Sequence, residues 1–280
     1  MRIKITSDST CDLAPALCRK HDIALLPLTV IKNNESFKDN VTITPAEIFA
    51  HVANGGSLCS TSAGNIPDYE ELFTRYSGEY DGILHISLGS GFSSSYQNAC
   101  IAAEEFPNVK VVDSQNLSTG QGLVVLYACQ LAQNCESLDK LHEDVQAYTS
   151  RVEASFLLNR LDYMVKGGRC SAAAALGANL LNLKPCIEVK NGKMGVVKKY
   201  RGSYAKCLAS YVKDRLDSRE DLPREFLFLT YTTINDECLQ AVKNGIEQYG
   251  HFAEMEECTA GCTISCHCGP ETLGILFVRK

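Results

Sequence analysis

The sequence lacks a run of apolar residues long enough to cross a membrane. Its longest apolar stretch, residues 123–132, is interrupted by Gln130 and falls short of the about 20 residues that a membrane-spanning helix needs. The first residues, 1–6, also lack the apolar core of a signal peptide. We therefore expect a soluble, cytoplasmic protein.

Clusters of Lys and Arg are absent as well. The 280 residues contain 27 Lys and Arg against 33 Asp and Glu, a formal net charge of -6, and no basic stripe occurs along the chain. Binding to a phosphate backbone requires such clusters. The sequence therefore argues against nucleic acid as a partner.

The cysteines are too sparse for a small disulfide scaffold. There are 14 in 280 residues, and a chain of this length can bury a core without disulfide staples. Five of them lie in apolar, helix-compatible stretches, where a thiol behaves as a small hydrophobic group: Cys18, Cys100, Cys129, Cys207 and Cys238. We interpret the cysteines as reduced thiols.

One dense cysteine group raises the alternative of a metal site. Cys258, Cys262, Cys266 and Cys268 are separated by three, three and one residues, with His267 between the last two. These spacings match neither zinc pairs nor a ferredoxin run. If residues 263–268 form a strand, three of these cysteines share one face and His267 lies on the other. We expect no metal here.

The most informative stretch is a glycine- and hydroxyl-rich turn, residues 87–97. It follows the apolar run 82–86 and leads into a helix-compatible run, so it predicts a strand, a turn and a helix. Backbone N–H groups and hydroxyls at such a turn favour an anion. The turn contains no charged residue and no His, which favours a small carboxylate over a phosphate.

The first half of the chain alternates predicted strands and helices. Strands are expected at 2–6, 23–31, 82–86 and 109–112, which indicates a parallel sheet in a three-layer α/β domain. Four loops rich in Ser and Thr are expected at the ends of strands, where open parallel sheets bind ligands: residues 7–10, 60–62, 87–95 and 114–119.

The second half has a different pattern. The apolar stretch 172–183 reads as a helix, Asn191-Gly192 predicts a hairpin between residues 186–189 and 194–198, and two helices flank a strand at 225–231. We expect an α+β domain here. The predicted division is an N-terminal domain over 1–155 and a C-terminal domain over 156–280.

Six segments, which run nearly from end to end in one order and spacing, carry a family resemblance. They are residues 7–13, Thr61-Ser62, 92–97, 165–171, 181–185 and 267–270. Together they resemble the DegV family, bacterial fatty-acid-binding proteins that serve a fatty acid kinase. The chain departs from the family's usual pattern at Gly64, where Pro is common, and at Glu271, where Gly is common.

The resemblance implies a fatty acid held in a tunnel between the two domains. By motif position, its carboxylate contacts would be Thr61, Ser62, Ser93, Arg201 and His267. We interpret residues 172–183 and 226–229 as candidate tunnel walls.

The same resemblance implies a carrier that presents the carboxylate to a fatty acid kinase. Such a subunit has neither catalytic residues nor a cofactor of its own. Transient contact with a membrane is compatible with this role.

Two enzyme classes remain as alternatives from the residues alone. The loop Gly89-Ser90-Gly91 approximates a dinucleotide-binding turn, and Asp113 ends the next strand where a ribose-binding acid belongs, which would suit an oxidoreductase. The third glycine of that motif is missing. Residues 85–89 place Ser87 in an incomplete nucleophile elbow, the pattern of a serine hydrolase without its first glycine.

Overall fold

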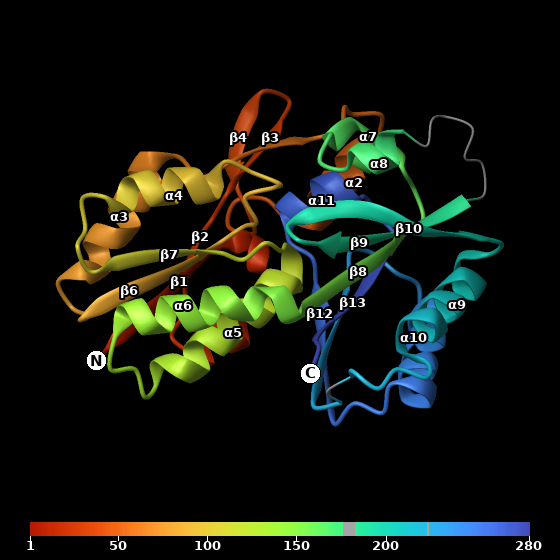
Figure 1. The fold of residues 1–280 in the computed structure, drawn as a ribbon. Coiled ribbons are helices and arrows are strands. Elements are labelled where there is room, and N and C mark those ends of the chain that lie inside the picture. The colour runs from red at the N-terminus through yellow and green to blue at the C-terminus, as the bar shows by residue number, and fades with distance from the viewer. Residues whose placement is uncertain (176–182, 223) are drawn as a thin grey trace.

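A computed structural model describes residues 1–175, 183–222 and 224–280 (Figure 1). Three sheets are present in this part of the chain, with four, three and six strands. The strands are β1 (Ile3–Asp8), β2 (Ala24–Leu26), β3 (Thr29–Lys32), β4 (Glu35–Lys38), β5 (Ser60–Ser62), β6 (Gly82–Ser87), β7 (Val109–Asp113), β8 (Val152–Leu158), β9 (Leu183–Lys190), β10 (Lys193–Arg201), β11 (Phe226–Tyr231), β12 (Glu254–Thr259) and β13 (Thr272–Val278).

Helices cover these sheets. They are α1 (Pro15–Lys20), α2 (Pro45–Ala53), α3 (Ile66–Ser77), α4 (Ser95–Ala103), α5 (Ser118–Ala132), α6 (Leu138–Tyr148), α7 (Asp162–Gly167), α8 (Ser171–Ala174), α9 (Tyr204–Leu216), α10 (Asp236–Tyr249) and α11 (Cys262–Cys268), with 3-10 turns η1 (Ser9–Cys11) and η2 (Thr149–Arg151). The helix α2 begins at the capping box of Thr44 and Glu47, as its sequence predicts.

The four-stranded sheet confirms the predicted three-layer α/β arrangement. Its order is β2-β1-β6-β7 and all pairs are parallel. Helices α3 and α4 cover one face and α5 and α6 the other (Figure 1). The strand β6 is buried over its whole length, with Ile83 packed towards α3 and α4 and Leu84 and Ile86 towards α5.

The expectation of one strand over residues 23–31 was wrong. Pro27 has no N–H to donate, and the chain leaves the sheet there. Before it, Leu26 pairs with Asp8 in the parallel sheet. After it, Thr29 starts β3 in the separate antiparallel sheet β4-β3-β5. Residues 60–62, expected as a loop at a strand end, are the strand β5 of that sheet.

The six-stranded sheet has the order β10-β9-β8-β13-β11-β12, antiparallel except for the β11–β12 pair. The predicted hairpin is confirmed as β9 and β10. Helices α9 and α10 cover one face, while α5 packs on the other and so joins the two sheets (Figure 1). These findings confirm the α/β fold class. The predicted division near residue 155 falls within β8 and stays a prediction.

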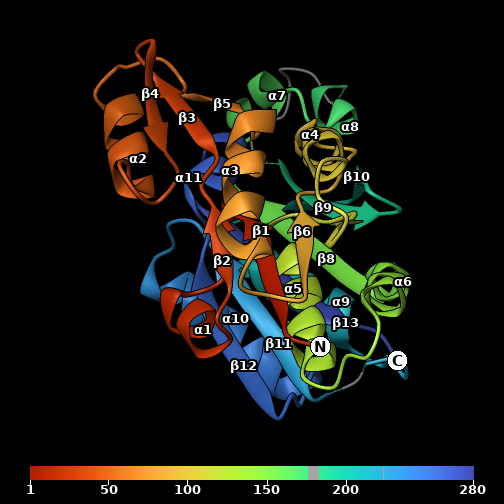
Figure 2. The same ribbon diagram turned by 90° about the vertical axis from the view of Figure 1, so that its left-hand side faces the viewer.

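A short helix near the C-terminus, α11, connects the two parts. It packs against α2, β3 and β5 of the first half and against α7 of the second (Figure 2). Asp12 Oδ1 accepts a hydrogen bond from Gly261 N at 2.9 Å, and Asp39 Oδ1 accepts one from Cys262 N at 2.8 Å. Two acidic side chains from the first half thus cap this helix. The alternative of a strand over residues 263–268 was wrong.

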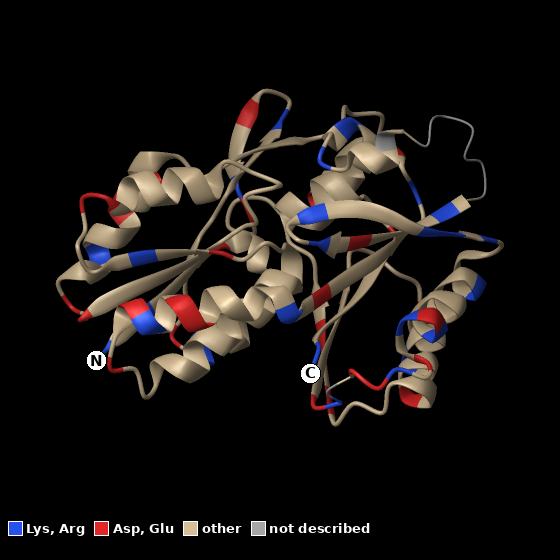
Figure 3. Cartoon of the chain, in the orientation of Figure 1, with Lys and Arg blue, Asp and Glu red and all other residues tan. Residues whose placement is uncertain are grey.

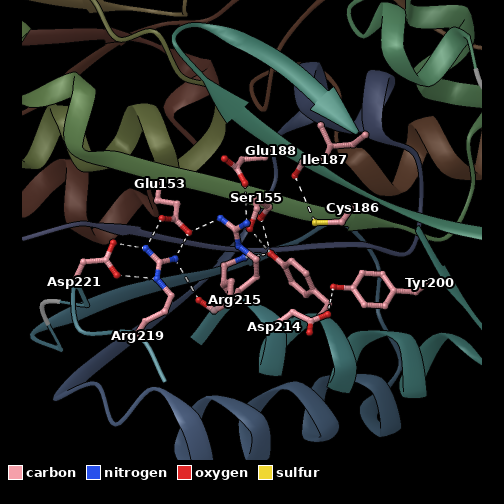
Figure 4. Close-up of polar contacts among 12 residues, drawn as sticks. Glu153, Ser155, Cys186, Ile187, Glu188, Tyr200, Asp214, Arg215, Arg219 and Asp221 are labelled. Carbon is pink, nitrogen blue, oxygen red and sulfur yellow. Dashed lines mark hydrogen bonds and ion pairs between the residues drawn. The ribbon is translucent and has the colours of Figure 1, made fainter. Parts of the chain in front are cut away.

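An ion network lies between the six-stranded sheet and α9 (Figure 4). Glu153 on β8 accepts hydrogen bonds from both Arg215 and Arg219, and its Oε1 lies 2.6 Å from Arg219 Nη1. Arg215 also pairs with Glu188 at 2.7 Å, and Arg219 with Asp221 at 2.5 Å. The network ties β8 and β9 to the end of α9.

Most of the predicted helix and tunnel wall at 172–183 lies outside the described residues. Only its start, in α8 and Ala175, and its last residue, Leu183 in β9, are described. In the described part of the chain, no helix combines the length and the apolar character that crossing a bilayer requires.

Candidate functional site

Four of the five predicted site residues line one hollow between the first half and the second. Its volume is about 540 Å³, counted with the space open to solvent, a size typical of sites for small ligands. The residues around it come from β5, the β6–α4 loop, α7, β10 and α11. They are Leu28, Thr61, Ser62, Ala63, Leu88, Phe92, Ser93, Leu117, Met164, Arg169, Met194, Thr263, Ile264, His267 and Cys268.

A hydrogen bond between Thr61 and His267 lies at the centre of this site. Thr61 Oγ1 is 2.7 Å from His267 Nε2, and which atom donates depends on the imidazole tautomer. Burial lowers the pKa of His267 to about 4, and the positive charge of Arg169 acts in the same direction. The imidazole is therefore neutral at pH 7, and Arg169 is the one cationic side chain among the described residues that line the hollow.

Ser93 belongs to a hydroxyl cluster at the start of α4. Its Oγ lies 2.9 Å from Ser95 Oγ and accepts a hydrogen bond from Ser95 N at 3.1 Å. Ser95 Oγ in turn accepts one from Gly64 N at 3.3 Å. These bonds tie the loop of Ser93 to the turn that follows Thr61 and Ser62.

Gly64, where the family usually has Pro, lies close against Tyr69. A Cβ at this position would lie 2.6 Å from the hydroxyl oxygen of Tyr69, so a larger residue would require the buried Tyr69 ring to shift. The other departure, Glu271, is directed away from the site. Its Oε2 accepts a hydrogen bond from Asn159 Nδ2 at 2.6 Å, and Glu271 does not line the hollow.

The two arginines differ in position. Arg169 lines the hollow and donates from Nη1 to Gly167 O at 2.6 Å. Arg201 ends β10, is exposed, and is not among the residues that line the hollow. It follows a group of exposed lysines on the same strand, Lys193, Lys198 and Lys199 (Figure 3). A role of Arg201 at the carboxylate stays a prediction.

Sequence reasoning missed Thr263 and Arg169 as site residues. Thr263 Oγ1 is buried at the hollow and has no hydrogen-bond partner among the described residues, so it is available to a ligand. Thr263 lies outside the six segments that carry the family resemblance, so no motif marked it. Arg169 follows Gly167-Gly168, a pair that marks a turn but does not distinguish a site arginine from a surface arginine.

A second, mostly apolar hollow lies next to the first. Its volume is about 400 Å³, and it lies between α5 and the six-stranded sheet. Leu117, Ile264 and Cys268 line both hollows, so the two meet along a shared wall. On the sheet side the second hollow is bordered by β8, β11 and β13. A polar site is thus adjacent to an elongated apolar space.

The dinucleotide alternative has no support in the geometry. The Asp113 carboxylate accepts hydrogen bonds from Ser90 N at 3.0 Å, Ser90 Oγ at 2.5 Å and Gln115 N at 2.9 Å, so it closes its own loop. A Cβ at Gly91 would lie 2.1 Å from Gly192 O. The turn of the β9–β10 hairpin therefore packs directly against the glycine loop and leaves no space for a ligand group at Gly91.

The serine hydrolase alternative fails on access and on hydrogen bonding. Ser87 is wholly buried and its Oγ donates to Asp8 Oδ2 at 2.8 Å. His85 Nδ1 pairs with Thr6 Oγ1 at 2.9 Å, so neither group reaches a substrate. Burial alone would raise the pKa of Asp8. His85 and the donors of Leu88 and Tyr69 outweigh burial and lower this pKa.

The cysteine group does not assemble a metal site. Cys258 lies on β12 and the other three lie on α11. No group of three or more His, Cys, Asp or Glu side chains is arranged to hold a metal ion in the described part of the chain. All 14 cysteines are free thiols. Burial raises the pKa of Cys262 and of Cys268 to about 12, so both are protonated at pH 7.

Comparisons with known proteins agree with the resemblance. The family model of DegV matches residues 2–280. A DegV domain-containing protein of Clostridium acetobutylicum is 33% identical over 284 residues, which covers 100% of this chain and 99% of the relative.

Solved structures are similar over the whole chain. A fatty-acid-binding DegV family protein from Thermus thermophilus has a TM-score of 0.90 at 28% identity, with 100% of both chains covered. A DegV lipid-binding protein from Thermotoga maritima has a TM-score of 0.85 at 26% identity, again with 100% of both chains covered. On the match of the family model and the identity to its relatives, this chain belongs to the DegV family.

Proposed function

We propose that this protein binds a long-chain fatty acid and presents its carboxylate to a fatty acid kinase. The observation that carries the proposal is that the two hollows adjoin. The hollow that contains the hydroxyls of Thr61 and Ser93 shares Leu117 and Ile264 with the apolar hollow beside it. Fatty acid binding by the similar protein of Thermus thermophilus and lipid binding by that of Thermotoga maritima support it.

The carboxylate would be held by neutral donors with one cation nearby. Thr61, Ser62 and Ser93 offer hydroxyls, and neutral His267 keeps the Thr61 side chain in place. Two residues that the sequence did not single out complete this end. Thr263 provides a further hydroxyl, and Arg169 supplies positive charge at the rim.

The acyl chain would provide most of the binding free energy. Each methylene removed from water contributes about 0.8 kcal/mol, and a long chain carries many of them. The polar end then fixes orientation and leaves a carboxylate oxygen facing solvent. On this proposal the protein is a carrier with no catalytic residue of its own, located in the cytoplasm, where its thiols stay reduced.

Arg201 has a different place in this proposal. It lies with exposed lysines on β10, outside the hollow. A kinase surface of opposite charge would meet this strand beside the presented carboxylate. We therefore assign Arg201 to the contact with the kinase and Arg169 to the ligand.

Mass spectrometry of the purified protein, native and after solvent extraction, tests the ligand first. We expect one fatty acid per chain, and a nucleotide in its place would contradict the proposal. Titration of delipidated protein with a fluorescent fatty acid tests the polar end. Thr61→Val and Ser93→Ala should each weaken binding about tenfold through loss of a hydrogen bond to a charged group, while Ser60→Ala, on the same strand but outside the hollow, should not.

A coupled assay with a fatty acid kinase and ATP separates the two arginines. Arg169→Ala should weaken fatty acid binding. Arg201→Ala should leave binding unchanged and lower the rate of acyl phosphate formation. Equal binding and equal turnover in all four variants, including Thr61→Val and Ser93→Ala, would refute the proposed site.

A further inference from the structure

The second hollow lies above a glycine in the middle of the six-stranded sheet. Gly274 on β13 pairs in register with Phe156 on β8 and Thr230 on β11. A Cβ at Gly274 would lie 2.7 Å from Ser155 O, so the position admits no larger residue without a shift of the backbone. The missing side chain leaves space between the sheet and α5, and Gly274 forms the floor of the hollow.

The next row of the sheet closes this space. Ala154, Leu276 and Phe228 stand side by side on β8, β13 and β11. Leu276 lines the hollow and is 5% exposed, whereas Phe228 is fully buried behind it. Beside Ala154, helix α5 approaches closely, since a Cβ at Gly120 would lie 3.3 Å from Ala154 Cβ. The hollow ends at this row.

Beyond the row lies a further space, lined by apolar side chains and by Gln130, Arg151 and Glu225. A third hollow of about 830 Å³, counted with its open side, is lined by Phe226 and Val278, each two residues from the closing row on its own strand. Successive side chains on a strand alternate between faces, so Val278 lies on the same face as Leu276. Tyr127 and Leu126 of α5 border it on the helix side. The wall between the two spaces is therefore one side-chain row thick.

We propose that Leu276 is the stop that sets the length of the acyl chain this protein accepts, which rests on the proposed fatty acid function. The chain extends from the carboxylate end past Leu117 and over Gly274, and its terminal methyl group meets the Leu276 side chain. A smaller residue at 276 extends the tunnel towards Phe226. A larger one shortens it.

The test is a competition measurement on delipidated full-length protein with saturated fatty acids of 12 to 20 carbons, using displacement of a fluorescent fatty acid. Leu276→Ala should shift the preferred length upward by two or more carbons and raise the affinity for the 20-carbon relative to the 16-carbon acid about tenfold, from the added methylenes buried. Leu276→Phe should shift the preference downward. Leu276→Val removes less of the side chain and serves as the test if Leu276→Ala does not fold. It should shift the preferred chain length in the same direction as Leu276→Ala.

Leu273→Ala is the matched control. Leu273 lies on the same strand, is fully buried, and packs on the opposite face against the α9 side. It should lower thermal stability about as much as Leu276→Ala and leave the length preference unchanged. An equal length shift in this control would overturn the proposal, because general loosening of the sheet would then explain it.

The remaining outcomes separate the stop from the proposed function. If folded Leu276 variants bind fatty acids with the wild-type preference for chain length, Leu276 does not set the length of the acyl chain. The proposed carrier function would not be affected by that result. A wild-type protein that binds no fatty acid of any length would overturn both.

Discussion

Thr61 and His267 are 206 residues apart in sequence, and their side chains meet at 2.7 Å. The first lies on β5 and the second on α11, so this one hydrogen bond joins the antiparallel sheet of the first half to the C-terminal helix. The polar end of the site exists only where these two elements are held together. The caps from Asp12 and Asp39 on α11 contribute to the same alignment.

The free energy of unfolding should fall at low pH because His267 is buried in its neutral form. Its pKa is about 4 in the folded protein, lowered mainly by burial, against an ordinary value of 6.5. Between these two pH values the unfolded chain binds the proton and the folded protein does not, so stability is fully present above pH 6.5 and is lost as pH falls to 4. His267→Gln should flatten the unfolding free energy across this window, by at most about 1.4 kcal/mol per pH unit.

Urea unfolding of ligand-free protein at four pH values from 4.5 to 7.5 measures the effect. His251→Gln, at an exposed position, is the control and should retain the wild-type slope. Parallel curves for His267→Gln and wild type would contradict burial of a neutral imidazole.

Asp12 should make the free energy of unfolding change with pH in the opposite direction, at higher pH. Burial, together with the charge of Asp39, raises its pKa to about 8 from 3.8, against the opposing effect of the hydrogen bonds from Ser118 and Gly261. Between pH 4 and 8 the folded protein retains a proton that the unfolded chain has released. Stability from this group therefore falls as pH rises.

Asp12→Asn keeps an acceptor for Gly261 N and removes the titration. We expect it to reduce the loss of unfolding free energy between pH 6 and 8, measured by chemical denaturation. Asp236→Asn, at an exposed position, should change nothing in that range. A slope in Asp12→Asn as steep as in wild type would assign the pH dependence to another group.

The ion network of β8 should be essential for stability. Glu153 is 9% exposed and accepts hydrogen bonds from two arginines. Glu153→Gln leaves both guanidinium groups with one carboxylate each, and removal of one partner from a buried network costs about 3 kcal/mol. Thermal unfolding should show a large drop in Tm.

The exposed pair Glu71–Arg75 on α3 provides the comparison. Glu71→Gln should cost less than about 1 kcal/mol, as is typical of surface ion pairs. Equal effects of the two substitutions would mean that the network contributes no more than a surface pair.

The close contact between Gly91 and Gly192 is possible because Gly91 has no side chain, so adding a Cβ at Gly91 should lower stability. A Cβ at Gly91 would lie 2.1 Å from Gly192 O, a backbone atom of the β9–β10 turn. Gly91→Ala should destabilise the protein by about 1–3 kcal/mol because the two loops must separate. Gly195→Ala, where a Cβ meets nothing within 4 Å, should be neutral within about 1 kcal/mol in the same denaturation measurement.

The sequence predicted the parallel sheet and the hairpin because their signals are local. Apolar runs such as residues 82–86 and the turn Asn191-Gly192 determine their own conformation with little help from the rest of the chain. Pro27 was a visible signal for a break, but the β-branched residues on either side of it favoured a single strand over residues 23–31. Only the fold shows that the two parts join different sheets.

The candidate site was predicted in part, since its members come from distant segments. Hydroxyls in family motifs located Thr61, Ser62, Ser93 and His267 at one hollow. Arg169 was not separable from a surface arginine by sequence alone. Thr263 was missed because it lies outside those motifs, on a helix that is capped by Asp12 and Asp39, more than 200 residues away.

The position of β13 has a consequence for how the chain acquires its structure during synthesis. This strand is the last in sequence, yet it lies between β8 and β11 in the middle of the six-stranded sheet. Until β13 has left the ribosome, β8 and β11 have no partner along the edges that β13 joins, and α11 emerges only shortly before β13. The first α/β half can fold early. The sheet that borders the second hollow is complete only once β13 has been made, so a chain that stops before β13 would leave β8 and β11 each with one unpaired edge.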